Sequence, residues 1–134
     1  MASALAKKVR MQPGQRVLVM HAPPDYFEAL GELPDGVRIS REPDGEYDFV
    51  HLFVSSRAEL DARAPAALRA VKYDGILWIS YPKQSAKLKT DINRDAGWDI
   101  VFQAGLRPVT QVAINHIWSA LRFRPLEKVL SRER

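Results

Sequence analysis

The sequence predicts an α/β domain of three layers, in which helices cover both faces of a mostly parallel sheet. Three continuous apolar runs, at residues 16–20, 47–54 and 76–81, have the length of strands and lack the alternation of a half-exposed strand. A helical segment between the second and third runs makes a βαβ unit, whose two strands lie parallel in one sheet. Two further β-rich runs, at residues 109–114 and 118–123, predict an antiparallel hairpin at the C-terminal end.

Shorter elements flank the first apolar run. Residues 4–11 can form a short amphipathic helix, which is followed by a Pro-Gly pair that ends it. After the run, residues 25–30 are long enough for one or two helical turns, with Asp25 as the N-cap. Two turns rich in proline and glycine then enclose a short strand at residues 37–40.

The helix after the second apolar run has a clear start signal. Ser56 and Glu59 have the spacing of a capping box, in which each side chain satisfies a backbone donor of the other. Pro65 either interrupts this helix or begins a second one. Gly75 is expected to mark the turn into the third strand.

One more long helix is predicted before the C-terminal hairpin. Thr90 or Asp91 caps its start, and it runs to about residue 104, where Gly105 ends it. The charged residues 126–134 are expected to form a flexible or helical tail. A chain of 134 residues falls within the usual size of one domain, so residues 1–134 are expected to form a single unit.

The composition excludes several classes of site. The chain has no cysteine, so disulfides, thiolate metal sites and a cysteine nucleophile are excluded, and a cytoplasmic location is expected. The N-terminus lacks the apolar core of a signal peptide. The longest strongly apolar run, residues 75–81, is far too short to cross a bilayer. The three histidines lack the spacing of metal ligands, so no metal site is expected.

The net charge of +4 is unevenly distributed along the chain. Residues 25–61 carry ten acidic and three basic side chains, whereas residues 62–134 carry thirteen basic and six acidic ones. Such a distribution can steer an anionic ligand or a nucleic acid toward one face, or it can reflect two solvated surfaces. The basic residues are scattered singly rather than clustered with stacking aromatic residues, so nucleic acid is not the expected partner.

Polar side chains follow the ends of the predicted strands, where open α/β sheets bind their ligands. His21 follows the first strand, Ser55 the second, and Ser80 and Tyr81 end the third. His21 could titrate near neutral pH, or it could be a structural residue held by one hydrogen bond. His51 lies within a strand and is expected to be buried and hydrogen-bonded. The serines lack the glycines of a nucleophile elbow, and no catalytic residue is assigned.

The basic loop after the third strand is the best candidate for anion binding. Lys83, Lys89 and Thr90 lead into the predicted helix start, where free N–H groups and the helix dipole favour negative charge. Asp91 would itself occupy that positive end. The alternative interpretation is a solvated loop without a ligand.

Two stretches of the sequence are similar to S-adenosylmethionine-dependent methyltransferases. Residues 65–80 resemble the helix, turn and strand of that family, with Tyr73-Asp74 in place of Pro-Gly. The hairpin after Gly105 resembles the antiparallel last strand of methyltransferase sheets. The resemblance implies a truncated, Rossmann-like methyltransferase fold. Residues 81–95 and 118–125 more closely resemble a short bacterial protein family that brings no activity with it.

The sequence departs from methyltransferases where the family binds its cofactor. The family has a glycine-rich turn after the first strand, where backbone approaches the methionine part of the cofactor. Here residues 20–25 contain no glycine, and Pro23 and Pro24 lack backbone donors. After the next strand, Ser40 and Arg41 precede Glu42, the nearest acid that could hold the ribose. S-adenosylmethionine therefore stays a candidate cofactor without its usual motif.

Three functions are compatible with these features. The first is a non-catalytic methyltransferase-like domain that binds a small anionic ligand or a protein partner. The second is a divergent methyltransferase, whose cofactor is held by His21, Ser55 and Ser80. The third is a nucleic-acid-binding module. A homodimer could also form through the exposed hairpin that carries Trp118 and Phe123.

Overall fold

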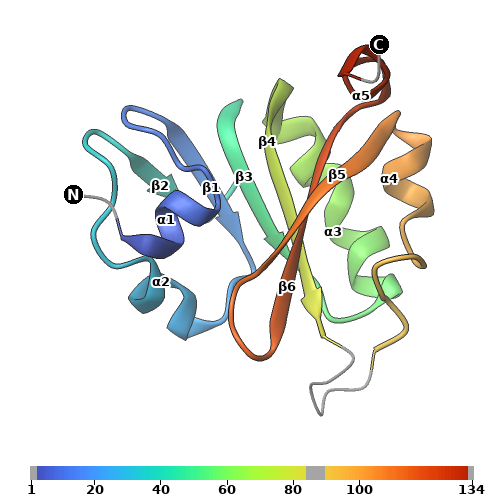
Figure 1. Cartoon of the computed structure of the whole chain (residues 1–134), viewed down its shortest axis with the longest axis horizontal. Coiled ribbons are helices and arrows are strands. Elements are labelled where there is room, and N and C mark those ends of the chain that lie inside the picture. Colours follow the sequence, from blue (N-terminus) through green and yellow to red (C-terminus); the bar gives the residue numbers. More distant parts are fainter. Residues whose placement is uncertain (1–2, 84–89, 133–134) are drawn as a thin grey trace.

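The computed structural model describes residues 3–83 and 90–132, which form a single six-stranded sheet flanked by helices (Figure 1). The strand order is β2-β1-β3-β4-β6-β5. The first four of these strands pair in parallel, and β6 and β5 continue the sheet in antiparallel fashion. The predicted fold class is confirmed.

All predicted strands are present, and their bounds are β1 Arg16–Met20, β2 Arg38–Ser40, β3 Tyr47–Phe53, β4 Val71–Pro82, β5 Leu106–Ala113 and β6 Trp118–Pro125. β4 begins five residues earlier than predicted, so the prediction that Gly75 marks a turn is wrong. The pairing of β3 with β4 shifts register between Tyr47 and Phe49. A Cβ at Gly75 would lie 3.0 Å from the Lys72 carbonyl oxygen. Glycine therefore serves a close backbone approach inside an irregular strand.

The described helices are α1 Ala4–Lys8, α2 Pro24–Leu30, α3 Arg57–Ala70, α4 Asp99–Gln103 and α5 Leu126–Arg132. Alternate residues of β1 pack into two separate cores: Leu18 belongs to the core under α3 and α4, and Val19 belongs to the core under α1 and α2. The sheet is thus buried on both faces, as the continuous apolar runs predicted. None of the described helices is long and apolar enough to span a membrane.

Helix boundaries differ from the prediction at four points, the first being that α1 ends at Lys8 and not at residue 11. α3 continues through Pro65, so the predicted interruption or restart there is wrong. Pro23, not Asp25, is the N-cap of α2, and Pro24 is its first residue. The helix expected to run from Thr90 or Asp91 is reduced to α4, which begins only at Asp99. At the C-terminal end, residues 126–132 form α5, whose Leu126 N–H donates to the Gly105 carbonyl at 2.8 Å.

Short side-chain bonds replace the first turns of the expected helix after Thr90. The Thr90 hydroxyl accepts from the Ile92 N–H at 3.1 Å, and the Asn93 side chain accepts from the Asp95 N–H at 2.8 Å. Such bonds offer the backbone an alternative to helical bonds. Gly97 has a φ of 106°, which is incompatible with a helix, so the expected helix cannot extend through this position.

The connection from β2 to β3 has no helix. Residues 41–46 alone join these parallel strands, which lie on either side of β1. The Tyr47 hydroxyl holds this connection: it donates to the Glu42 carbonyl at 3.3 Å and accepts from the Asp44 N–H at 3.0 Å. The Arg16 guanidinium lies 4.1 Å from the centre of the Tyr47 ring. The connection between β2 and β3 is therefore a loop and not a helix.

Candidate functional site

The parallel strands all end at the same edge of the sheet, which brings several predicted site residues to one side of the molecule. His21 follows β1, Ser55 follows β3, and Lys83 follows β4. From β1 the chain crosses to β2 on one side, and β3 and β4 lie on the other. The crevice at such a reversal of strand order is where open α/β sheets bind ligands. His21 and Ser55 lie next to this reversal of strand order, because β1 and β3 are neighbours.

His21 is exposed and forms a sharp turn at the end of β1. Its φ of 60° lies in the left-handed region, which residues other than glycine seldom adopt. The chain therefore makes a glycine-like turn without a glycine. The following Pro23 and Pro24 begin α2 without a side-chain cap. Since neither proline has an N–H group, the start of this seven-residue helix offers fewer donors to a ligand than usual.

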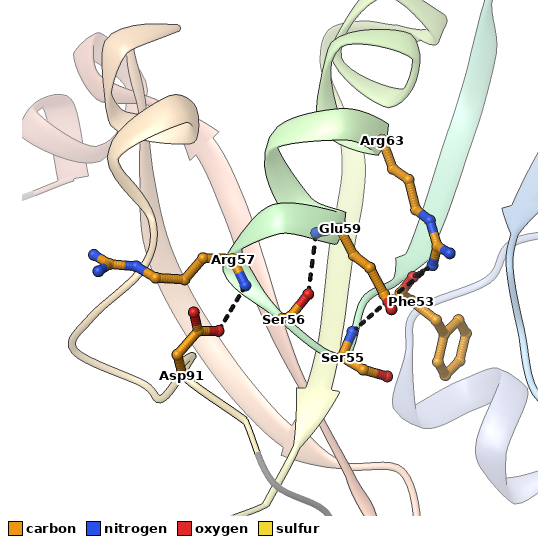
Figure 2. Close-up of polar contacts among 7 residues, drawn as sticks. All are labelled: Phe53, Ser55, Ser56, Arg57, Glu59, Arg63 and Asp91. Atoms are coloured by element: carbon orange, nitrogen blue, oxygen red, sulfur yellow. Dashed lines mark hydrogen bonds and ion pairs between the residues drawn. The ribbon is translucent and has the colours of Figure 1, made fainter.

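Ser55 lies where β3 leads into α3, and its surroundings are held by a set of capping bonds (Figure 2). The Ser56 hydroxyl accepts from the Glu59 N–H at 3.1 Å, as predicted. Glu59 reaches back to the N–H of Ser55, at 2.8 Å, rather than to that of Ser56. Arg63 then ties Glu59 to the Phe53 carbonyl. The backbone of Ser55 is thus fixed, and Figure 2 shows its hydroxyl directed away from Glu59.

Ser80 lies in a buried polar chain and not at the open edge. Its hydroxyl is 2.6 Å from His51 Nε2, and the Tyr26 hydroxyl is 2.7 Å from His51 Nδ1. All three residues are buried. Burial lowers the pKa of His51 to about 3 and raises the pKa of Tyr26, so the imidazole is neutral at pH 7. His51 is buried and hydrogen-bonded, as predicted. The hydrogen bonds from Tyr26 through His51 to Ser80 link α2 to β3 and β4.

A pocket of about 590 Å³ lies beyond the end of β4 and contains two of the predicted site residues. Tyr81 and Lys83 line it, together with residues from the 90–98 segment and the hairpin: Asn93, Arg94, Asp95, Ala96, Gln111 and Ser119. Thr90 is half-buried and is not among the lining residues. Lys89 lies outside the described residues. The expected helix start next to these lysines is absent, so the helix dipole does not contribute to this pocket.

The polar groups of the pocket suit an anionic ligand. Gln111 Nε2 donates to the Tyr81 hydroxyl oxygen at 3.0 Å, which leaves the Tyr81 O–H proton for another acceptor. Burial raises the pKa of Tyr81, Arg94 lowers it and Asp95 raises it, so the net shift keeps this donor protonated. Among the lining residues that the structure describes, Lys83 and Arg94 outnumber one acid, Asp95. Arg94 contacts Asp95 at 3.4 Å in an exposed pair, which is a weak interaction in water.

Sequence reasoning missed Arg94, Gln111 and Ser119. Ser119 pairs with Tyr81 across β4 and β6, and Gln111 comes from the next strand. The predicted hairpin could have indicated that alternate residues of both strands face one side. Arg94 had no such signal, because the segment that carries it was predicted to be helical. Within the described residues, no group of three or more histidine, aspartate or glutamate side chains could hold a metal ion.

Comparison with known proteins places the fold. No protein-family model and no curated protein sequence matches the chain. A solved S-adenosylmethionine-dependent methyltransferase from Aquifex aeolicus matches with a TM-score of 0.56 at 15% identity, over 89% of this chain and 86% of that one. The ribosomal protein L11 methylase of Lactobacillus delbrueckii subsp. bulgaricus matches with a TM-score of 0.54 at 10% identity, over 90% and 74%. The fibrillarin pre-rRNA processing protein of Methanococcus jannaschii matches with a TM-score of 0.52 at 11% identity, over 84% of this chain and 67% of that one. The chain therefore has the fold of S-adenosylmethionine-dependent methyltransferases.

Proposed function

We propose that this chain is a divergent methyltransferase-type domain that binds S-adenosylmethionine in the crevice between His21 and Ser55. The observation that carries the proposal is the position of these two side chains, at the reversal of strand order in a fold shared with solved methyltransferases. The comparisons favour this function over a domain without catalysis, because two of these similar structures are described as a methyltransferase and a methylase.

The proposed binding mode relies on side chains more than on backbone. Two prolines remove backbone N–H donors at the start of α2. At the end of β2, the Arg41 guanidinium is in contact with the Phe27 ring, whose centre lies 4.2 Å away. The His21 imidazole and the Ser55 hydroxyl are then the polar side-chain groups that follow β1 and β3 at this edge of the sheet. Glu42 is the nearest acid after β2 for the ribose hydroxyls.

Titration with S-adenosylmethionine and S-adenosylhomocysteine tests this proposal. Ligand at 100 times its dissociation constant should raise the free energy of unfolding by about 2.7 kcal/mol, which is several degrees in a thermal melt. Asparagine tolerates positive φ, so His21→Asn should preserve the turn. His21→Asn and Ser55→Ala should both weaken the binding of S-adenosylmethionine. His116→Ala, at an exposed position, is the matched control. The absence of any shift with millimolar ligand would overturn the proposal.

A second candidate function is the binding of a small polar anion in the pocket beyond β4. The observation that favours it is that Tyr81, Lys83 and Arg94 line one pocket of about 590 Å³, a size usual for small-molecule sites. The pocket and the crevice lie at the ends of neighbouring strands, so the two functions are compatible. A methyltransferase needs a place for its acceptor as well as for its cofactor.

Replacement of the two pocket cations is expected to weaken anion binding. Inorganic phosphate and acetate serve as probes, followed by amide chemical shifts at Arg94 and Ser119. Lys83→Ala combined with Arg94→Ala should lower affinity at least tenfold, since each charge-assisted hydrogen bond contributes about 1.5–3 kcal/mol. Lys7→Ala removes one exposed positive charge from α1 and should change nothing. Equal binding by the double variant and the wild type would exclude this pocket.

A further inference from the structure

The segment of residues 90–98 forms one wall of the anion pocket and is docked onto the start of α3. Four consecutive residues of this segment, 93–96, line the pocket. Asp91 Oδ1 accepts a hydrogen bond from the Arg57 N–H, the first helical residue of α3, at 2.8 Å (Figure 2). Close by, a Cβ at Gly97 would lie 3.4 Å from Arg57 Cγ, so the segment passes against the Arg57 side chain.

The other end of the segment is anchored to the sheet. Trp98 is buried, and its ring packs at 5.5 Å from the Tyr81 ring and at 5.2 Å from the Phe123 ring. Trp98 Nε1 also donates to the Asn93 carbonyl at 2.8 Å. The backbone that carries Arg94 therefore lies between two anchors, one at α3 and one at β4.

We infer that Asp91 is a positioning residue for the anion pocket, an inference that rests on the second proposed function. Asp91 does not line the pocket. Its carboxylate fixes the start of the 93–96 wall by capping a helix that lies 34 residues earlier in the chain. When that bond is lost, the wall gains conformations, and a ligand must order it again on binding. Affinity should then fall although both pocket cations remain.

Three variants separate this role from charge and from general stability. Asp91→Ala removes the acceptor and the charge, whereas Asp91→Asn removes the charge and keeps an oxygen that can accept from Arg57. Ser56→Ala removes a different capping acceptor at the same helix end, the one for the Glu59 N–H, and leaves the 90–98 segment untouched. All three are titrated with inorganic phosphate in the full chain, and their amide hydrogen exchange is measured without ligand.

We expect Asp91→Ala to weaken phosphate binding about tenfold, as loss of a capping bond allows, and Asp91→Asn to restore most of it. Exchange at Ala96, whose N–H donates to the Asn93 carbonyl, should be faster in Asp91→Ala and unchanged in Ser56→Ala. If the wild type binds phosphate and the affinities of Asp91→Ala and Ser56→Ala do not differ, the inference about Asp91 is overturned while the second proposed function stands. No phosphate binding by the wild type would overturn the second proposed function, and unchanged Ala96 exchange in Asp91→Ala would overturn the positioning role independently.

Discussion

Acidification from pH 7 to pH 4 is expected to lower the free energy of unfolding by about 3 kcal/mol through His51 alone. Burial lowers the pKa of His51 to about 3 from a usual value of 6.5. Between these two values the unfolded chain binds a proton that the folded chain does not, so stability rises with pH across this window. The free energy of unfolding linked to His51 therefore has its full value above pH 6.5 and decreases as the pH falls toward 3.

Urea unfolding at a series of pH values measures this effect. His51→Leu should be less stable at pH 7, because the Tyr26 and Ser80 hydroxyls lose their partner, with a cost of about 1–3 kcal/mol for each unsatisfied group. Its stability should depend much less on pH between 4 and 7. His116→Ala, which changes an exposed histidine, should keep the wild-type profile. A wild-type profile as flat as that of His51→Leu would contradict the neutral buried imidazole.

Truncation of Trp78 is expected to destabilise the fold by about 3–5 kcal/mol, the usual cost of a buried tryptophan-to-alanine change. The side chain is fully buried in the core under α1 and α2. Its Nε1 donates to the Val9 carbonyl at 2.8 Å and so ties β4 to the end of α1. Trp78→Ala removes the packing and this bond together, and it leaves the Val9 carbonyl without its partner.

Denaturant midpoints of two further variants separate packing from hydrogen bonding. Trp78→Phe keeps most of the apolar area and should cost only about 1–2 kcal/mol. Tyr73→Phe removes one hydroxyl from an exposed ring and should stay within about 0.5 kcal/mol of the wild type. A cost for Trp78→Ala no larger than that of Tyr73→Phe would contradict the buried position of Trp78.

The fold and the proposed functions rest on different kinds of observation. The structural similarity to a solved methyltransferase and a solved methylase, over 89% and 90% of this chain, identifies a scaffold, and one scaffold can serve many activities. The proposed functions depend instead on particular side chains, namely His21 and Ser55 at the crevice and Tyr81, Lys83 and Arg94 in the pocket. The titrations with S-adenosylmethionine and with phosphate therefore test the side chains and leave the fold assignment intact.

The strands, the parallel sheet with its antiparallel hairpin, and the Ser56 cap of α3 were all predictable from the sequence. These features depend on short-range patterns: β1 and β3 are continuous apolar runs, and Ser56 and Glu59 are three residues apart. The burial of His51 was equally visible, because it lies between apolar neighbours within a strand.

The partners of several polar side chains became known only from the folded structure. Asp91 has the sequence position of a cap for the helix that follows, yet it caps α3. Ser80 stands at the end of a predicted strand, yet its hydroxyl meets His51 under α2. In each case the bond joins residues about 30 positions apart, and no local propensity encodes such a contact. Local pattern fixes which backbone segments form, and the packing of those segments fixes which polar groups meet.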